Sequence, residues 1–154
     1  MNKFVSQKGF TLIEMVIVIA VVGILMGLAF NGIRGVQSAA RDTKRTADLR
    51  SMQSYLELYF NKCGHYPGNA DCTENSSQNF AGMKSVIEQS VANTGDIPED
   101  PQKSGGASYV YGTDANNNEY VIGATMEKTK PRGSAAGTID GVNCDAAKLF
   151  CLRS

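Results

Sequence analysis

The 154-residue chain has no tryptophan, a single histidine and no C-x-x-C pair among its four cysteines. Structural zinc sites draw on several His and Cys ligands at short spacings, so the lone His65 and the scattered cysteines argue against one. The sequence also lacks a Ser/His/Asp arrangement with motif context, a glycine-rich phosphate-binding loop and paired carboxylates in a recognisable frame. These absences favour a structural role, and we expect no enzymatic activity.

Charge is scarce in one stretch near the amino terminus. Residues 10–30 are apolar apart from Thr11 and Glu14. A bilayer-spanning helix needs about 20 apolar residues, so this run is long enough to span. Glu14 is a carboxylate one turn inside the run, where a charge costs free energy and usually marks a function or a partner. The sequence therefore predicts a transmembrane segment over residues 10–30 that contains an acid in need of a cation.

A short basic leader ending in Lys8 precedes this run. It resembles the class III signal of type IV pilins and type II secretion pseudopilins, and the matching residues are Gly9-Phe10-Thr11-Leu12-Ile13-Glu14. In that family a membrane peptidase cuts after the glycine and methylates the new amino-terminal residue. The resemblance implies a leader peptide over residues 1–9, cleavage after Gly9 and methylation of Phe10. It also implies that Glu14 pairs with the amine of a neighbouring subunit during filament assembly.

An ordinary secretory signal is the competing interpretation of this terminus. Such a signal is cut after its apolar region, at small residues of A-x-A type, and residues 28–32 offer no good site of that kind. Lys3 and Lys8 precede the span, which favours a cytoplasmic leader and export of the rest. We therefore expect a single-pass protein of the cytoplasmic membrane before assembly, and an extracellular or periplasmic filament afterwards.

The apolar run continues into a second stretch with helical character. Residues 38–60 contain no proline and many good helix formers. An apolar stripe recurs at helical spacing through this stretch, formed by Leu49, Met52, Leu56 and Tyr59. We predict one long helix over residues 10–61, whose second half lays this stripe against a small sheet.

The remaining residues, 62–154, are predicted to form a globular head. Its expected elements are a helix over residues 79–92, strands over 107–112 and 119–127, and a polar turn over 113–118. The Tyr-x-Tyr strand and the turn after it resemble the sheet region of a major secretion pseudopilin. The resemblance implies the pilin fold, an α+β architecture in which a long amino-terminal helix, transmembrane and then amphipathic, packs on a small antiparallel sheet.

The four cysteines all lie outside the apolar run. Exported chains can keep disulfides, and four cysteines allow three pairings. We favour the local pairing of Cys63 with Cys72 and of Cys144 with Cys151, and the other pairings stay open. The resemblance supports a disulfide-closed loop near the carboxyl terminus, since many pilins have one.

Three residues of the polar turn alternate as calcium ligands would, namely Asp114, Asn116 and Asn118. The glycine and the distal glutamate of a calcium loop do not follow in register, and a hairpin turn rich in Asp and Asn explains the same residues. The resemblance keeps calcium as a weak candidate, because some secretion pseudopilins bind it in this region. We expect no other cofactor and no other metal.

The formal net charge is zero, but the charges are unevenly distributed. Residues 34–50 carry a balance of +3 and residues 51–154 a balance of −4. A basic stem and an acidic head could attract each other between stacked copies. A solvated helix face beside an acidic surface explains the same pattern equally well, and both interpretations stay open.

The resemblance implies a structural subunit that polymerises into a type IV pilus-like filament. Its implied partners are further copies of the chain, a prepilin peptidase, and an assembly ATPase with its membrane platform. Two alternatives within the family are the major pseudopilin of a type II secretion system and a DNA-uptake competence pilin whose basic stem or head loops bind nucleic acid. A monomeric membrane-anchored binding module is the alternative outside it.

Overall fold

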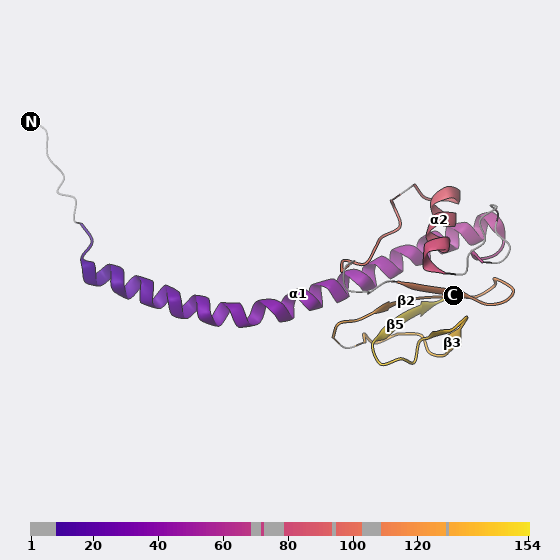
Figure 1. The fold of residues 1–154 in the computed structure, drawn as a ribbon. Helices are drawn as coiled ribbons and strands as arrows, with labels where there is room; N and C mark the ends of the chain where they lie inside the picture. The colour runs from indigo at the N-terminus through magenta and orange to yellow at the C-terminus, as the bar shows by residue number, and fades with distance from the viewer. Residues whose placement is uncertain (1–8, 69–71, 73–78, 94, 103–108, 129) are drawn as a thin grey trace, which may run out of the picture. The chain divides into compact units, whose positions relative to one another are not determined.

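The structure of the chain is a computed structural model. It describes all residues except 1–8, 69–71, 73–78, 94, 103–108 and 129, as well as the side chains of residues 29–34. The order of elements is α1 (Leu12–Cys63), α2 (Phe80–Ser90), β1 (Val110–Thr113), β2 (Tyr120–Thr125), β3 (Thr138–Ile139), β4 (Val142–Asn143) and β5 (Leu149–Arg153). Figure 1 labels α1, α2, β2, β3 and β5. Two compact units divide inside α1, Met1–Gln37 and Ser38–Ser154. Most of the predicted leader lies outside the described residues.

The first unit, hereafter the stem, contains the amino-terminal half of α1. Every described side chain from Phe10 to Leu28 is exposed, and most of these side chains are large and apolar. In the part of the chain that the structure describes, no helix is both long and apolar enough to cross a membrane. The span expected over residues 10–30 thus stays a prediction.

The second unit, hereafter the head, is built on a three-stranded antiparallel sheet in the order β1-β2-β5. β1 pairs with β2 through a tight hairpin, with Thr113 opposite Tyr120, and β2 pairs with β5, with Ile122 opposite Leu152. A small hairpin of β3 and β4 forms a second sheet, in which Ile139 lies opposite Val142.

One face of the three-stranded sheet carries the carboxyl-terminal half of α1. The predicted stripe of Leu49, Met52, Leu56 and Tyr59 is fully buried in a cluster with Tyr111, Ile122 and Phe150 of the sheet. Burial of such side chains is the main favourable contribution to folding. The prediction of an amino-terminal helix packed on a small antiparallel sheet is confirmed.

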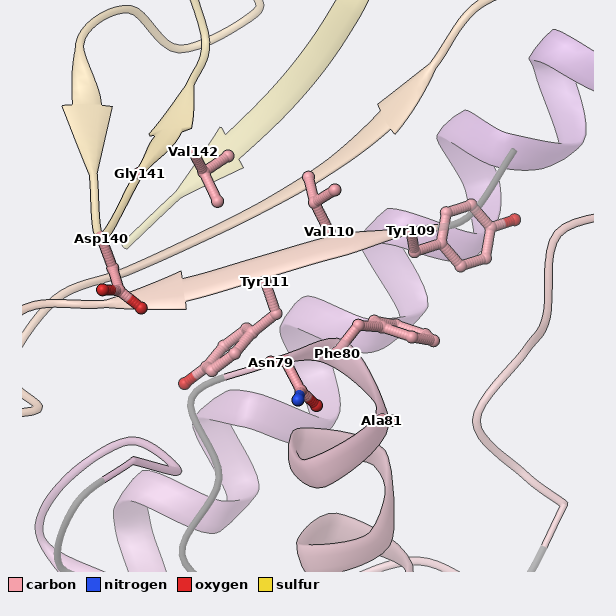
Figure 2. Close-up of a pocket in the computed structure, with 9 residues that line it drawn as sticks. All are labelled: Asn79, Phe80, Ala81, Tyr109, Val110, Tyr111, Asp140, Gly141 and Val142. Atoms are coloured by element: carbon pink, nitrogen blue, oxygen red, sulfur yellow. The ribbon is translucent and has the colours of Figure 1, made fainter. Parts of the chain in front are cut away.

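The opposite face of the sheet carries the β3–β4 hairpin. Side chains alternate along a strand, so Val121 and Cys151 point away from α1. They pack with Ile139 and Val142 of the hairpin in a second apolar cluster. Figure 2 shows the same alternation at β1, where the side chain of Val110 lies on the hairpin side and that of Tyr111 on the other. The head therefore has three layers: α1, the sheet and the hairpin.

The ends of the helices agree with their local sequence. α1 ends at Cys63, and Gly64 follows in the left-handed region with φ of 77°, donating its N–H to the carbonyl of Phe60 at 2.7 Å. Asn79 caps α2 by accepting a hydrogen bond from the N–H of Gly82 at 2.9 Å. The helix expected over residues 79–92 is therefore present, somewhat shorter than predicted.

The sheet departs from prediction mainly after residue 127. β1 and β2 overlap the two predicted strands, although residues 107 and 108 lie outside the described part of the chain. Residues 128–154 show no predicted element, whereas the structure has β3, β4 and β5 there. β3 and β4 are two residues each and are separated by Asp140 and Gly141, so they are too short to show an alternating pattern.

Candidate functional site

The amino-terminal motif forms a helix cap. Thr11 precedes the first residue of α1, and its hydroxyl accepts a hydrogen bond from the N–H of Glu14 at 3.3 Å. The Glu14 carboxylate in turn accepts hydrogen bonds at 3.0 Å from the backbone N–H and from the hydroxyl of Thr11. This reciprocal pattern is a capping box, which satisfies amides at the helix start that have no intrahelical partner.

The cap provides Glu14 with hydrogen-bond partners on its own chain. Glu14 has local donors in Thr11, which the sequence analysis did not assign a role, although Thr11-x-x-Glu14 is a readable capping signature. Gly9 and Phe10 are exposed and lie ahead of the helix, so the bond between them is sterically open. Both the cleavage after Gly9 and the pairing of Glu14 with an amine stay predictions.

The stem offers a continuous apolar surface. Residues from Leu12 to Leu28 expose between 43% and 83% of each of their large apolar side chains. Scattered exposed apolar residues are ordinary on soluble proteins, but a contiguous patch of this kind marks a surface for a partner or a membrane. The stem and its cap are therefore the first candidate functional surface.

A second feature is an ionic cluster, centred on Arg45, inside the head. The Arg45 side chain is completely buried on α1. Its guanidinium forms a two-point contact with the Asp100 carboxylate, from Nε to Oδ2 at 2.7 Å and from Nη2 to Oδ1 at 3.0 Å. Nη1 also donates to Asp42 Oδ1 at 2.9 Å and to Glu127 Oε1 at 3.0 Å. One cation thus joins three segments that are far apart in the sequence.

The cluster continues to the end of β2. Arg41 contacts the Glu127 carboxylate through two hydrogen bonds of 2.6 Å. The Asp42 carboxylate accepts the N–H groups of Glu127 and Lys128 at 2.9 and 3.0 Å. Charge-assisted and two-point contacts of this kind have a strict geometry. The cluster of Arg41, Asp42, Arg45, Asp100 and Glu127 therefore fixes α1 to the sheet at the beginning of the head.

The titration of these groups reflects their contacts. The hydrogen bonds from Arg41, supported by Arg45, lower the pKa of Glu127 to about 2. Burial disfavours the charged form of Asp100, but the hydrogen bonds from Arg45 and from the Gln102 N–H outweigh it and lower its pKa. The hydrogen bonds to Asp100 raise the pKa of Arg45, although burial opposes this. All three groups are charged at neutral pH.

The structure contains two disulfides, and they join the cysteines of the favoured local pairing. Cys63 at the end of α1 is bonded to Cys72, and Cys144 after β4 is bonded to Cys151 of β5. The first closes the segment that leaves α1, and the second attaches the hairpin layer to the sheet. Each therefore constrains a connection that has little regular structure of its own.

The turn that contains the calcium candidates has its own hydrogen bonds. Asp114 Oδ1 accepts the N–H groups of Asn118 and Glu119 at 2.6 and 2.9 Å, and Oδ2 accepts that of Asn116 at 3.3 Å. The hydrogen bond from Glu119 is the main reason why the pKa of Asp114 is lowered. These contacts are those of an Asp-initiated turn. Calcium binding by Asp114, Asn116 and Asn118 stays an untested prediction.

Among the described residues, no group of three or more His, Cys, Asp and Glu side chains is placed to hold a metal ion. His65 lies in the turn after α1, with Nδ1 3.0 Å from the Tyr66 carbonyl oxygen and its ring against the edge of Tyr59. The described contacts of His65 are thus made within this turn and with α1.

A pocket of about 500 Å³ opens beside β1, between the start of α2 and the β3–β4 turn (Figure 2). The hydroxyls of two tyrosines on its wall are already engaged. Tyr111 donates to the Pro67 carbonyl at 2.7 Å, and Tyr109 donates to Asp48 Oδ2 at 2.6 Å. Burial, with this hydrogen bond, raises the pKa of Tyr109. The pocket therefore has aromatic walls whose polar groups serve the fold.

Comparison with known proteins agrees with the amino-terminal motif. Residues 5–30 match the family model described as the prokaryotic N-terminal methylation motif. The chain is 33% identical over 62 residues to type II secretion system core protein G of Escherichia coli K12, covering 40% of this chain and 43% of that protein. It is 36% identical over 62 residues to the protein of the same name from Klebsiella michiganensis, covering 40% and 44%.

A similar match involves a protein with a different name. The chain is 38% identical over 63 residues to the fimbrial protein of Neisseria meningitidis serogroup B, covering 41% of this chain and 37% of that protein. The chain thus spans less than half the length of the curated relatives it matches. No solved structure is significantly similar to it. The methylation motif and these relatives thus make the amino-terminal part of the chain similar to type IV pilins and type II secretion pseudopilins, and the helix-on-sheet head agrees with that similarity.

Proposed function

We propose that the chain is a structural subunit that polymerises through its stem into a pilus or pseudopilus filament. The observation that carries the proposal is the continuous exposed apolar surface of residues 12–28, which begins at the capped Glu14. Bundling with the stems of other copies removes it from water, at roughly 25 cal/mol for each Å² buried.

The subunit passes through a membrane stage before it assembles. A prepilin peptidase cuts after Gly9 and methylates Phe10, and residues 10–30 hold the subunit in the cytoplasmic membrane as a single span. An assembly ATPase and its membrane platform then extract it into a filament outside that membrane. The subunit has no catalytic part in these steps. Two observations support this order of processing and assembly: the methylation motif over residues 5–30 and the exposed Gly9–Phe10 bond.

Glu14 recruits the next subunit by its charge. In the uncut chain it accepts hydrogen bonds from Thr11, which keep it in place without neutralising it. Cleavage after Gly9 creates an amine on Phe10. A carboxylate and an amine that are both buried in an apolar bundle stabilise each other, whereas either one left unpaired there costs several kcal/mol.

A second candidate function is that of the major subunit of a type II secretion pseudopilus. The similarity to secretion core protein G from two organisms favours it. Coexpression with a secretion machinery and with a pilus machinery separates the two. Secretion restored in a strain that lacks its own major pseudopilin supports the second candidate, and surface filaments without restored secretion support the first.

Mass spectrometry of assembled material tests the shared proposal. A filament built from subunits that begin at Phe10, one methyl group heavier than the unmodified peptide, is the expected result. A Gly9→Val variant is the matched control, because it blocks the cut while leaving Phe10, Thr11 and Glu14 unchanged. A mature terminus beyond Phe30, or a subunit that stays monomeric with the complete machinery present, contradicts the proposal.

A further inference from the structure

We propose that neighbouring copies of the chain contact each other head to tail, through a basic surface beside α1 of one head and the acidic β3–β4 hairpin of the next. Arg50 and Asp140 are the two residues at the centre of this contact. The inference rests on the proposed filament function and identifies the contact that the heads make within it.

The basic surface lies on the α1 side of the head. Residues 38–50 contain four Lys and Arg against two Asp. Arg41 and Arg45 are engaged in the ionic cluster, whereas Lys44 and Arg50 are exposed and their side chains form no ion pair with any described residue. A groove of about 340 Å³ runs beside Arg50, between α1 and Pro131. The groove is lined by Asp42, whose carboxylate is engaged in the ionic cluster, and by Arg50, whose guanidinium is not.

The acidic surface is the hairpin layer. Residues 134–147 contain Asp140 and Asp145 and no Lys or Arg. Asp140 and Gly141 form the turn of the hairpin, both in the left-handed region, with φ of 45° and 77°. The Asp140 side chain is exposed and has no hydrogen bond or ion pair among the described residues (Figure 2). It is a negative charge at the end of a tight turn.

The sheet separates these two surfaces within one chain. α1 packs on one face of the sheet, and the hairpin covers the other. At Gly112 the hairpin lies so close that a Cβ atom would come within 2.9 Å of the Ile139 carbonyl oxygen. Arg50 therefore belongs to the layer on one side of the sheet, and Asp140 belongs to the layer on the other side. A contact between the two charges joins two copies of the chain.

The arrangement has the symmetry that a filament requires. A contact between two different surfaces of identical subunits repeats from copy to copy; it builds a ring where the rotation between copies closes and an open helical filament where it does not. A second copy of the chain carries both surfaces, whereas a nucleic acid fits only the basic one. The opposite charges on opposite faces therefore favour a second copy as the occupant of the groove.

The two parts of the subunit then have different tasks. An exposed ion pair contributes little stability by itself, since solvent and salt screen it. Bundled stems provide most of the adhesion, and the contact between Arg50 and Asp140 sets the orientation of each head relative to the next.

Disulfide trapping in the full chain tests the contact. Arg50→Cys and Asp140→Cys are introduced together, the chain is coexpressed with the assembly machinery, and mild oxidation is followed by a non-reducing gel. The expected result is a ladder of dimers, trimers and longer species. Each single variant stays monomeric, and the two single variants expressed together yield dimers and nothing longer, because each pair of chains then holds only one matched contact.

A control pair shows whether trapping is specific. Asn61 is exposed on α1, in a different turn from Arg50. Asn61→Cys with Asp140→Cys should stay monomeric under the same oxidation. Assembled filaments in which Arg50→Cys with Asp140→Cys also stays monomeric would overturn the contact. Monomers together with DNA retention that Arg50→Glu abolishes would overturn it too, and would assign the basic surface to nucleic acid.

A charge exchange provides an independent readout. Arg50→Glu should lower filament yield severalfold, and adding Asp140→Lys to it should restore at least half of the wild-type yield. Asp140→Asn tests the charge alone, since Asn tolerates the left-handed region. If the wild-type chain forms no filaments at all, the filament proposal fails separately. The cysteine pair is then oxidised in membranes, where dimers uphold the contact and monomers overturn it.

Discussion

The two halves of α1 differ in what their apolar side chains contact. In the stem the apolar residues surround the helix and are exposed, as Leu25 illustrates with 60% of its side chain accessible. In the head they are confined to one stripe, and Leu56 at its centre is completely buried. A helix that is apolar on all sides is suited to a membrane or a bundle, whereas a striped helix is suited to one face of a domain core. One continuous helix therefore serves an external partner and an internal one.

The two halves of α1 also differ in whether their buried or apolar-flanked charges have counterions. Glu14 in the stem has only hydrogen bonds from Thr11, and its charge is not balanced within the described chain. Arg45 in the head is balanced by three carboxylates, Asp42, Asp100 and Glu127. A buried charge with its counterions contributes to a unique local structure, whereas a charge without them requires a partner. The comparison predicts that stem substitutions alter assembly and head substitutions alter folding.

The largest effect on folding is expected at the centre of the ionic cluster. Arg45→Ala leaves Asp100 buried without its counterion, so it should lower the free energy of unfolding by about 3–5 kcal/mol. Arg50→Ala is the matched control on the same helix, and its change should be within about 0.5 kcal/mol. Denaturant unfolding of the full chain in detergent measures both. All six tyrosines lie in the head, so the tyrosine bands of the near-ultraviolet circular dichroism spectrum report on that unit. Equal changes for the two variants would contradict the role assigned to Arg45.

A pair of leucine substitutions compares the halves directly. Leu56→Ala creates a cavity in the core and should lower the free energy of unfolding of the head by about 2–5 kcal/mol. Leu25→Ala should leave that free energy within about 0.5 kcal/mol of wild type, because its side chain contacts solvent in the single chain. Filament yield should fall for Leu25→Ala although its head is intact. If Leu25→Ala instead destabilises the head, the separation of the two units is wrong.

A smaller effect is expected on acidification. Ordinary side-chain carboxyl groups have pKa values of about 4. The pKa of Glu127 is lowered to about 2, and the pKa of Asp100 is also lowered. A carboxylate with a depressed pKa in the folded state stabilises that state above its unfolded pKa. The contribution is lost as the pH falls through the folded pKa.

Head stability should therefore be constant near neutrality and should fall from about pH 5 down to about pH 2. Glu127→Gln should flatten part of this decline, and unfolding measured at a series of pH values checks it. A decline that begins above pH 6, or one that Glu127→Gln leaves unchanged, would show that other groups control the acid response.

The sequence was informative wherever a pattern is local and periodic. The stripe of Leu49, Met52, Leu56 and Tyr59, the α2 helix and the β1–β2 hairpin follow from spacing and turn residues alone. The ionic cluster could not be predicted in this way, because its carboxylates at positions 100 and 127 reach Arg45 only through the tertiary fold. One signal was available: Arg45 lies four residues before Leu49, on the same stripe.

Two other features were missed for different reasons. The cap formed by Thr11 and Glu14 has a local signature, Thr-x-x-Glu, but the same glutamate also belongs to the pilin-like motif, which by itself accounts for its presence. β5 lies at the far end of the chain and pairs with β2. Its residue Cys151 also forms a disulfide with Cys144, so strand propensity is not the one constraint on its position. Nonlocal pairing of short strands is not encoded in any one stretch of sequence.

The central claim, that the charge of Glu14 assembles the filament, is tested most directly by Glu14→Gln in a strain without wild-type subunit. Glutamine keeps the hydrogen-bond acceptor of the cap, so the start of α1 and the cleavage after Gly9 should be unchanged. Thr11→Val is the control that removes the hydroxyl of the cap and keeps the charge, and it should assemble at reduced yield. We predict that the Glu14→Gln subunit is cut, accumulates in the membrane and forms no filaments. A normal filament yield from Glu14→Gln would contradict the account.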